Sequence, residues 1–556
     1  MKSRSSLFSV ALLFVVTLIG TKVGAVQAAP PYDVVIVNGR IVDGTGAPWY
    51  RGDVGIRNGK IAKIGRISPS AGRTVIDARG LIVAPGFIDM MGQTATPFLT
   101  DSAAAQNLLL QGVTTINAGE GVSAAPLSEE NARRAGWSTM AEYFSLLEKK
   151  GMPINVAQTV GHTQIRRLVL GEVDRRPTAA ELKRMQAYVR EAMQAGAIGV
   201  STALIYPPAV YAETEEIAAL AKVAGEYGGR YFTHMRNEGD RLLEAIDEAL
   251  QIGKVAGTPV HIFHLKAAGK QNWGKMPQAI AKIKAARASG QQVTADIYPY
   301  INNGLGIVAF MHPRNFTQGR EKLRRSLSDP TVRKRIKKEM ESEAGWENWF
   351  RHIGYDWNKV VLGSMTAKPY AKYNGKSLAE IAQSLKRDPW DTFFEISQVG
   401  AFALPQSMSE ANKIRAMRQE FVSFCTDVGP AGGNSRISSH PRAFGSFPRI
   451  LSRYVRELGV LSLEQAVSQM SSLAANEIMA YDRGRISQGL AADIVIFDFQ
   501  QIADRATLAA PHRPAVGMKY VLVNGQIVVK QGKFTGKKPG KVLRGPGYRM
   551  KRKDTQ

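Results

Sequence analysis

The chain has 556 residues, with 44% hydrophobic and 22% charged residues, so we expect a globular protein with a substantial core, one large domain and a smaller one. Cys425 is the only cysteine, which excludes an internal disulfide and a lipid-modified cysteine at a cleavage site. The formal net charge is +26, and removal of Lys2, Arg4 and Lys22 leaves +23.

The first residues have the pattern of a secretory signal peptide. Lys2 and Arg4 precede the apolar run LFSVALLFVVTLIG, and Val26-Gln27-Ala28 places small residues where a signal peptidase reads. We expect cleavage after Ala28, which makes 1–28 a signal peptide and the mature protein periplasmic or secreted. The apolar run is too short to span a bilayer comfortably, and no later stretch reaches about 18 uninterrupted apolar residues. An uncleaved membrane anchor formed by the first run is the alternative.

Both ends of the remaining chain predict short β-strands. Residues 32–85 read YDVVIVNGRIVDG, GDVGIRNGKIAKIG and TVIDARGLIVAPG, and residues 482–545 contain ADIVIFDF and YVLVNGQIVVKQGKF. The Asn-Gly pairs at 38, 58 and 524 lie between alternating apolar residues, a hairpin signal. We expect the two ends to pair in one small β domain.

The middle of the chain, 86–481, alternates strands and helices, which predicts the α/β class and a (β/α)₈ barrel. Thr178-x-x-Glu181 is a capping box that starts a helix, and Thr214 is expected to cap the next helix. Nine candidate strands are present where eight are needed, so KVVLGS (359–364) is assigned to an insertion at about 300–415. The other eight are GFIDMM (86–91), VTTINAGE (113–120), INVAQTVGH (154–162), AIGVSTAL (197–204), RYFTH (230–234), VHIFHL (260–265), QVTADIY (292–298) and FVSFCTD (421–427).

Much of the positive charge is local. Residues 320–340 and 532–554 are strongly basic, and 546–556 form a basic tail. Nucleic acid is one partner for such stretches, and a solvated helix face with a frayed tail is the other interpretation. Neither stretch alternates aromatic with basic residues, so we expect no nucleic acid. An exported protein would associate electrostatically with anionic envelope polymers instead.

Four polar residues follow predicted barrel strands: Glu120, His234, His264 and Asp427. Barrel enzymes place reactive groups at the carboxyl ends of their strands. Two imidazoles and a carboxylate suit a divalent metal with one position open for water, and a further carboxylate can take the proton of that water. A single histidine at a strand end is commonly a satisfied polar residue, and chain spacing alone does not show that the four converge.

Eight segments in order give the chain a family resemblance: GFID at 86, QGVTT at 111, GAIGVSTALIYPPAVYAETEE at 196, THMRNE at 233, HLKAAGKQNWG at 264, TADIYPY at 294, SSHPRAFGSFPRILSRYVRE at 438 and VLVNGQIVV at 521. With these segments the chain resembles the N-acyl-D-amino-acid deacylase (D-aminoacylase) family of the amidohydrolase superfamily. The resemblance covers about 34–545, nearly the whole mature chain.

The resemblance implies a metal-dependent barrel with a small β-sandwich built from both chain ends. It also implies a metal held by His234 and His264, with Glu120 at the bridging position and Asp427 as general base. The family's His-x-His positions are occupied here by Met91 and Gln93. A thioether is a poor zinc ligand, so we expect one Zn²⁺ per chain at the site that remains.

Other residues are expected to contact the substrate, from their place at strand ends or in motifs. Arg236 offers a planar fork for a carboxylate, and His261 is expected to be packed in the core. His312, His352 and His512 carry no argument. The expected substrate-binding residues are His162, Tyr206, Arg236, Lys266, Tyr298, His440 and Arg442.

The implied reaction is hydrolysis of the amide bond of a small N-acyl D-amino acid or a related D-residue peptide. Two alternatives stay open: a non-catalytic barrel that binds anionic envelope material, and hydrolysis of a lactone or cyclic amide on the same metal. The sequence does not predict the oligomeric state.

Overall fold

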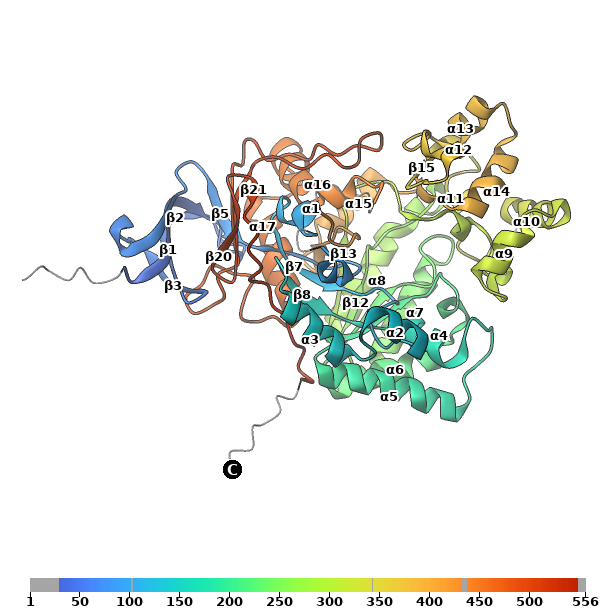
Figure 1. Cartoon of the computed structure of the whole chain (residues 1–556), viewed down its shortest axis with the longest axis horizontal. Helices are drawn as coiled ribbons and strands as arrows, with labels where there is room; N and C mark the ends of the chain where they lie inside the picture. The colour runs from blue at the N-terminus through green and yellow to red at the C-terminus, as the bar shows by residue number, and fades with distance from the viewer. Residues whose placement is uncertain (1–29, 102–103, 343, 433–437, 549–556) are drawn as a thin grey trace, which may run out of the picture.

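The structure, a computed structural model, describes residues 30–101, 104–342, 344–432 and 438–548. The predicted signal peptide (1–28) and the end of the predicted tail lie outside these residues. Figure 1 shows a β domain formed by the first and last parts of the chain, a central barrel and a helical insertion at the upper right. Within the described ranges, no helix is long and apolar enough to cross a membrane.

The barrel is built from parallel strands, as predicted. β6, β7 and β8 pair in that order, and β9, β10, β11, β12, β13 and β17 form the rest of the wall. Only Thr159 separates β8 from β9, and the amide of Met90 donates to the carbonyl of Phe424 at 3.2 Å, which joins β6 to β17. The strands are β6 (Phe87–Asp89), β7 (Val113–Ala118), β8 (Asn155–Gln158), β9 (Val160–Gly161), β10 (Gly199–Ala203), β11 (Arg230–His234), β12 (Val260–Ile262), β13 (Val293–Ile297) and β17 (Val422–Phe424).

Helices follow the barrel strands and cover them with apolar faces. In α5, for example, Met185, Val189 and Met193 are buried on one side, the i, i+4 spacing of an amphipathic helix. The helices of the barrel region are α1 (Gln106–Leu109), α2 (Glu129–Ala135), α3 (Met140–Lys150), α4 (His162–Leu170), α5 (Ala179–Ala195), α6 (Thr214–Glu226), α7 (Leu242–Ala256), α8 (Met276–Ala288), α15 (Glu410–Met417), α16 (Arg442–Arg449), α17 (Leu463–Ser468) and α18 (Ala474–Glu477).

The two predicted helix starts have different outcomes. Thr178 caps α5 and forms the predicted capping box with Glu181. The prediction for Thr214 is wrong, because Glu213 is the N-cap of α6 and Thr214 is its first helical residue. The hydroxyl of Thr214 donates instead to Oε1 of Glu248 on α7 at 2.8 Å, so a tertiary contact replaces the local cap.

The β domain is a nine-stranded sheet in the order β21-β20-β19-β18-β5-β1-β2-β3, with β4 paired to β1. Asn58-Gly59 and Asn524-Gly525 form the predicted hairpin turns. Asn38-Gly39 does not: it is an irregularity inside β1, where the register shifts. The strands are β1 (Tyr32–Ile41), β2 (Tyr50–Arg57), β3 (Lys60–Gly65), β4 (Gly72–Asp77), β5 (Ile82–Pro85), β18 (Ile494–Phe497), β19 (Met518–Val523), β20 (Gln526–Lys530) and β21 (Lys533–Phe534).

The first and last parts of the chain share a core in this domain. Ile36 and Val54 from the first part pack in one cluster with Ile494 and Leu522 from the last part. The pairing of β5 with β18 joins the two parts directly. The β-sandwich domain built from both chain ends is therefore confirmed together with the barrel.

The insertion leaves the barrel after β13 and has its own apolar core, which includes Trp357, Phe350 and Phe393. β15, which contains most of KVVLGS, pairs with β16 in a separate three-stranded sheet and not with the barrel. Its elements are β14 (Leu305–Gly306), α9 (Arg320–Ser326), α10 (Pro330–Ser342), α11 (Trp349–His352), β15 (Val360–Gly363), α12 (Lys368–Ala371), α13 (Leu378–Leu385), α14 (Pro389–Val399) and β16 (Phe402–Pro405).

The basic stretch 320–340 forms α9 and α10 of the insertion. Ile336, Glu339 and Met340 are the buried residues of α10. Lys334 and Lys338 are exposed. The exposed basic side chains of α10 thus lie on a solvated helix face, one of the two interpretations of this stretch.

Candidate active site

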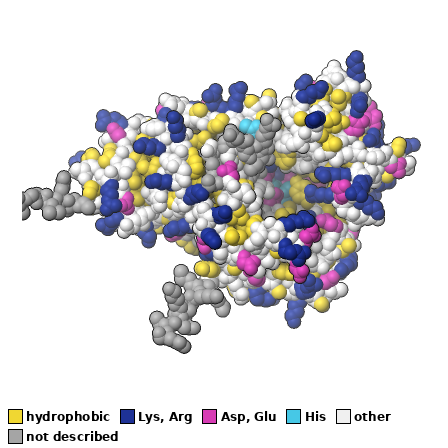
Figure 2. All heavy atoms as spheres, in the orientation of Figure 1, with side chains coloured by type: hydrophobic (Ala, Val, Ile, Leu, Met, Phe, Trp, Pro, Cys, Tyr) yellow, Lys and Arg dark blue, Asp and Glu magenta, His cyan; other side chains and the backbone are white. Residues whose placement is uncertain are grey.

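The carboxyl ends of the barrel strands open into a cavity of about 470 Å³ beside the insertion. Figure 2 shows the surface hollowed there, with acidic and histidine side chains at its floor. The cavity therefore brings together most of the predicted site, namely Glu120, Tyr206, His234, His264, Lys266, Tyr298, Asp427 and Arg442.

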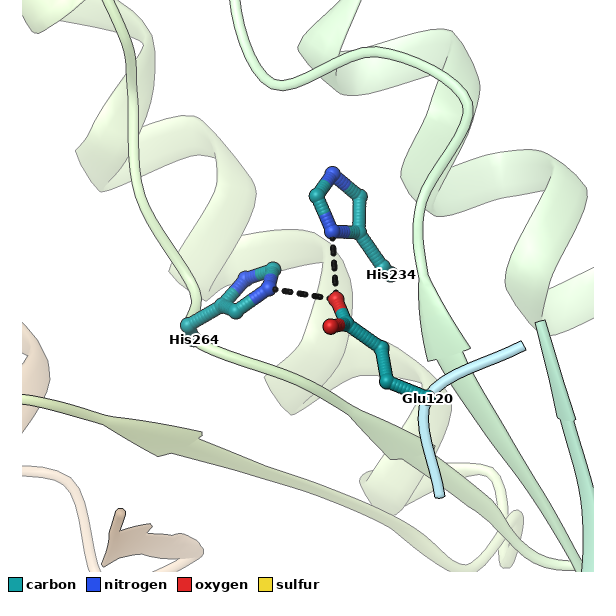
Figure 3. Close-up of side chains that lie close together, drawn as sticks. All are labelled: Glu120, His234 and His264. Carbon is teal, nitrogen blue, oxygen red and sulfur yellow. Dashed lines mark hydrogen bonds and ion pairs between the residues drawn. The ribbon is translucent and has the colours of Figure 1, made fainter. Parts of the chain in front are cut away.

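Three of these side chains converge on one point. Glu120 follows β7, His234 ends β11 and His264 follows β12. Oε1 of Glu120 lies 2.7 Å from Nδ1 of His234 and 3.2 Å from Nε2 of His264. The candidate ligand atoms of the three residues all lie within 4.8 Å of one another, and Figure 3 shows both rings pointing at the carboxylate.

This donor set fits a zinc ion. Two imidazole nitrogens and one carboxylate oxygen are ligands that catalytic zinc takes, with a further position open. Burial opposes ionisation of Glu120, but the hydrogen bonds to His234 and His264 outweigh it and hold the pKa of Glu120 below its usual range. The carboxyl group is therefore a charged ligand at neutral pH.

The far side of both imidazole rings faces Glu238. Its Oε1 lies 3.0 Å from Nδ1 of His264, and its Oε2 lies 3.7 Å from Nε2 of His234. Nε2 of His234 and Oε2 of Glu238 are both buried without a hydrogen-bond partner among the described residues. A metal on Nδ1 of His234 would leave the ring proton on Nε2, pointing at that carboxylate. Metal-binding histidines usually donate their second N–H in this way, so the two unpaired atoms support the fit.

Glu238 was missed by the sequence reasoning. It lies within the quoted segment THMRNE, four residues after His234. Nζ of Lys266 donates to Oε1 of Glu238 at 2.5 Å and also lies 2.6 Å from Nδ1 of His264. Its position four residues after a candidate ligand histidine is the sequence feature that could have identified Glu238 as part of the site.

Asp427 lies at the carboxyl end of β17 beside the three converging residues. Its Oδ1 accepts a hydrogen bond from Gln93, and its Oδ2 lies 2.5 Å from Nη1 of Arg442. Burial raises the pKa of the Asp427 carboxyl; the Arg442 guanidinium opposes this rise, and the Glu120 carboxylate adds to it. A carboxylate with a raised pKa suits a general base.

Gln93 joins the base to the metal-ligand set. Its Nε2 lies 2.7 Å from Oε2 of Glu120 and 2.7 Å from Oδ1 of Asp427, and donates one N–H to each. Met91 is buried in the barrel core with Ile88 and Phe232. Of the two residues in the His-x-His positions, Gln93 lines the cavity and Met91 is not among the lining residues.

Three site residues have positive backbone φ angles, which residues other than glycine rarely adopt: Gln93 at 56°, His264 at 36° and Asp427 at 53°. Buried aspartates hold the backbone beside two of them. Asp89 accepts from the amide and the hydroxyl of Thr426, next to Asp427. Strain of this kind persists where the surrounding structure enforces it, often in active sites.

Asp296 holds the backbone of His264 in the way that Asp89 holds the backbone beside Asp427. Its Oδ1 accepts the backbone N–H of His264 at 2.7 Å, and its Oδ2 lies 2.9 Å from Nε2 of His261. His261 is fully buried, as expected of a packed residue.

The structure places three predicted substrate residues elsewhere. His162 is fully buried, and its Nε2 lies 2.8 Å from Oε1 of Glu216. His440 is buried as well: its Nε2 donates to the carbonyl of Asn302 at 2.9 Å, and its Nδ1 accepts the backbone N–H of Arg442. Neither histidine lines the cavity. In each histidine one ring nitrogen, Nε2, contacts a partner from a distant segment, Glu216 or Asn302.

Arg236 is the third predicted substrate residue that lies outside this cavity. Its guanidinium makes two bonds of 2.8 Å to the carboxylate of Glu248 and further bonds to the carbonyls of Val210 and Ala212. The planar fork predicted to hold a substrate carboxylate is thus occupied by a carboxylate of the protein. Arg236 lines a neighbouring cavity and not the one with the three converging residues.

Four predicted substrate residues remain in the cavity. Nζ of Lys266 lies 5.9 Å, and the guanidinium carbon of Arg442 lies 4.8 Å, from the ring centre of Tyr298. Nε of Arg442 is buried and has no hydrogen-bond partner among the described residues. Burial raises the pKa of Tyr206 and Tyr298 well above the usual value, so both phenols keep their protons. The cavity therefore contains two cations, each in contact with a carboxylate of the protein, and two O–H groups.

A parallel barrel with a zinc-type donor set and a separate proton-accepting carboxylate belongs to the class of metal-dependent hydrolases. Similarity to known proteins identifies the family within this class. Residues 74–295 and 364–529 match the model of the amidohydrolase family. The N-acyl-D-glutamate deacylase of Alcaligenes xylosoxydans xylosoxydans is 34% identical over 522 residues, which is 92% of this chain and 96% of that protein.

Two solved structures agree. The crystal structure of N-acyl-D-glutamate deacylase from Bordetella bronchiseptica, with zinc and a phosphonate mimic of the tetrahedral intermediate, has a TM-score of 0.77 and 32% identity over 92% of this chain and 100% of that one. A D-aminoacylase structure described for one-metal activation and second-metal attenuation has a TM-score of 0.76 and 31% identity, with the same coverage.

This chain belongs to the amidohydrolase family, within its N-acyl-D-amino-acid deacylase (D-aminoacylase) branch. The expected enzyme class, a metal-dependent hydrolase of carbon–nitrogen bonds other than peptide bonds, is thereby confirmed.

Proposed function

We propose that this enzyme removes the acyl group from N-acyl D-amino acids or related D-residue peptides, with one zinc ion per chain. The observation that carries the proposal is the convergence of Glu120, His234 and His264, with Asp427 joined to them through Gln93. The similarity to a deacylase named for N-acyl-D-glutamate supports this substrate class.

The single metal is argued from Met91 and Gln93. Met91 is buried in the apolar core, and a thioether is a poor zinc ligand. The amide N–H groups of Gln93 bind the two carboxylates that would otherwise repel each other. An amide dipole therefore occupies a position between Glu120 and Asp427 where a second cation would compensate their charge. The other donor set keeps both histidines and is complete.

In this proposal the protein residues position the substrate and move the proton. Zinc, when bound, would polarise the amide carbonyl and make a water molecule more acidic. Asp427 takes the proton of the attacking water and delivers it to the nitrogen of the leaving amine. The protonated phenols of Tyr206 and Tyr298 offer hydrogen bonds to negative charge on the carbonyl oxygen.

Lys266 and Arg442 are the proposed partners of the substrate carboxylate. Both cations flank the ring of Tyr298. Lys266 also contacts Glu238 and Arg442 contacts Asp427, while Nε of Arg442 has no hydrogen-bond partner among the described residues. An N-acyl amino acid carries one carboxylate, on the amine side of the scissile bond. Charge-assisted hydrogen bonds from a guanidinium and an ammonium would fix that end.

We also propose that the mature enzyme is exported and is periplasmic or secreted. The basic start, the apolar run and the small residues up to Ala28 support export. The net charge of +23 that remains would favour association with an anionic envelope. Amino-terminal sequencing of the protein from fractionated cells tests this, and a mature chain that starts at Met1 would contradict it.

A substrate panel combined with metal analysis tests the proposed reaction. Zinc-loaded enzyme is offered N-acetyl amino acids of both hands, dipeptides, lactones and cyclic amides, and we expect hydrolysis of the D-series. Metal analysis should find about one zinc per chain, and none in His234→Ala or His264→Ala. A metal-free protein that hydrolyses nothing would point to a binding protein, and turnover of lactones or cyclic amides alone would assign another reaction.

A further inference from the structure

The last described segment of the chain, residues 537–548, covers the end of the barrel opposite the catalytic cavity. Pro539 forms an isolated bridge with Met152, and the amide of Gly545 donates to the carbonyl of Gly196 at 2.8 Å. Met152 precedes β8 and Gly196 precedes β10, whereas the barrel residues of the catalytic cavity lie at the carboxyl ends of their strands. Figure 1 shows this segment running past β8 and α3. It therefore lies at the amino-terminal face of the barrel.

Five lysines gather on this segment and on the neighbouring end of α3. Lys149 and Lys150 are the last residues of α3. A Cβ on the next residue, Gly151, would lie 3.3 Å from the Cβ of Lys538, so the end of α3 contacts the segment. We call the set the lysine patch; its members are Lys149, Lys150, Lys537, Lys538 and Lys541.

The protein does not compensate the charges of the lysine patch. All five lysines are exposed, and none of their side chains forms an ion pair or a hydrogen bond with another described residue. Glu148, the acidic residue beside Lys149, binds Arg544 instead, at 2.9 Å. The patch therefore presents five ammonium groups to solvent on one face of the molecule.

The longer basic stretch of the insertion differs in this respect. Four basic residues of α9 and α10 form ion pairs with acidic neighbours, namely Arg325 with Glu321, Arg333 with Asp391, Arg335 with Glu339 and Lys337 with Glu341. The positive charge of that stretch is thus partly neutralised within the protein. An anionic partner would gain more from the lysine patch, whose charges have no competing acidic group.

The chemistry of the patch suits a surface that carries many phosphates. A lysine ammonium is a compact charge on a flexible stem and does not impose the planar geometry of a guanidinium. Clusters of roughly four to eight basic residues bind anionic lipid headgroups, and each residue strengthens binding about fivefold. The sequence that follows Tyr548, RMKRKDTQ, adds four basic residues and one acidic residue to the chain at this end.

We propose that the lysine patch docks the enzyme on a bilayer of anionic phospholipids, with the catalytic cavity facing away from the bilayer. This inference rests on the proposed association with an anionic envelope and not on the proposed reaction. Because the patch and the cavity lie at opposite ends of the barrel, the docked enzyme keeps its cavity open to small substrates in solution.

Vesicle sedimentation tests the docking. The mature chain from Ala29 is used, so that the apolar run LFSVALLFVVTLIG does not contribute. It should bind vesicles that contain phosphatidylglycerol, but not vesicles of phosphatidylcholine alone, and high salt should release it because salt screens exposed charges. Replacement of the five patch lysines by glutamine should lower the partition coefficient at least roughly 100-fold, and Lys537→Gln with Lys538→Gln alone about 25-fold.

A variant with the same net charge is the matched control. It replaces by glutamine five exposed lysines of the insertion that form no ion pair with a described residue, namely Lys322, Lys334, Lys338, Lys368 and Lys386. It should bind vesicles within about fivefold of the wild type, because charges far from the bilayer are screened at physiological salt. Both variants should hydrolyse substrate like the wild type in vesicle-free buffer, so docking and reaction are measured separately.

Fluorescent labels report the orientation on the bilayer. Cys425 is buried, so a dye reacts only with an added surface thiol. Ser145→Cys places the dye on α3, one turn before Lys149, and Ser384→Cys places it on α13 of the insertion; both serines are exposed. Brominated phosphatidylglycerol should quench the first dye and leave the second unchanged.

The proposal has distinct ways to fail. Equal binding to neutral and anionic vesicles would overturn it. Equal losses in the two five-lysine variants would also overturn it, since net charge and not the patch would then drive an association. Quenching at Ser384→Cys in place of Ser145→Cys would assign the docking face to the insertion. Binding to dextran sulfate without binding to anionic vesicles would assign a polymer partner instead of a bilayer.

Discussion

The side-chain amide of Gln93 donates a 2.7 Å hydrogen bond to Oδ1 of Asp427. These residues are 334 positions apart in the chain, and the same nitrogen donates to Glu120. A neutral amide therefore links the candidate general base to the candidate metal ligands, at a position where the family pattern has a histidine.

Loss of this link should impair catalysis without loss of the metal. Gln93→Leu removes two hydrogen bonds to carboxylates, each typically about 1.5–3 kcal/mol. Since about 1.4 kcal/mol corresponds to a factor of ten, loss of the bond to the general base alone predicts that kcat falls roughly 10- to 100-fold with little change in KM. Zinc content, measured by metal analysis, should stay that of the wild type.

The control for this variant is Gln251→Leu on the exposed side of α7, which should keep wild-type kinetics. An unchanged kcat in Gln93→Leu would show that Asp427 needs no support from this amide.

Glu238 should determine how tightly the metal is held. Glu238→Gln keeps the shape of the side chain but removes the charge behind both histidines. Changes to such outer partners of metal ligands typically lower metal affinity 10- to 100-fold. Competition with a zinc chelator measures this, with Glu244→Gln, an exposed glutamate of α7, as the matched control. Equal zinc affinities of the two variants would refute the orienting role of Glu238.

Asp427 should be essential for turnover but not for metal binding. Asp427→Asn removes the proton acceptor, and we expect kcat to fall roughly 10²- to 10⁴-fold while zinc is retained. In the wild type the base acts when ionised, so kcat/KM should fall as the pH decreases through the pKa of Asp427. Because burial raises that pKa, the acid limb should lie above the pH at which an ordinary aspartate titrates. A profile without an acid limb would contradict the assignment.

Asp89 should make stability depend on pH. Burial raises the pKa of Asp89 to about 7, against 3.8 for an ordinary aspartate. The folded protein thus keeps a proton that the unfolded chain releases, so this contribution to stability is complete below about pH 4 and is lost as the pH rises through 7. A shift of this size corresponds to on the order of 4 kcal/mol.

Asp89→Asn removes the titrating group while an amide can still bond to Thr426. Chemical denaturation from pH 4 to 8 should therefore show the wild type losing stability relative to the variant as the pH rises. Parallel stability curves would mean that Asp89 does not titrate in the folded protein within this range.

The sequence by itself determined the fold and placed the candidate metal ligands at strand ends. Strand ends, capping boxes and Asn-Gly turns are local patterns, and the barrel rule places every strand end on one face. Glu120, His234, His264 and Asp427 were therefore candidates for one site, and the family resemblance, not their spacing in the chain, indicated that they converge. The two wrong local predictions, Asn38 and Thr214, are positions where strand pairing or a neighbouring helix outweighed a short-range preference.

The tertiary structure decided which polar side chains are already bound by other residues of the protein and which line the cavity. His162, Arg236 and His440 have the residue types of a binding site, but Glu216, Glu248 and Asn302 reach them from distant segments and use their hydrogen-bonding groups. Gln93 and Glu238 acquire their positions in the same way. A hydrogen bond joins two partners, and the identity of the second partner depends on how the elements pack, which no local pattern records.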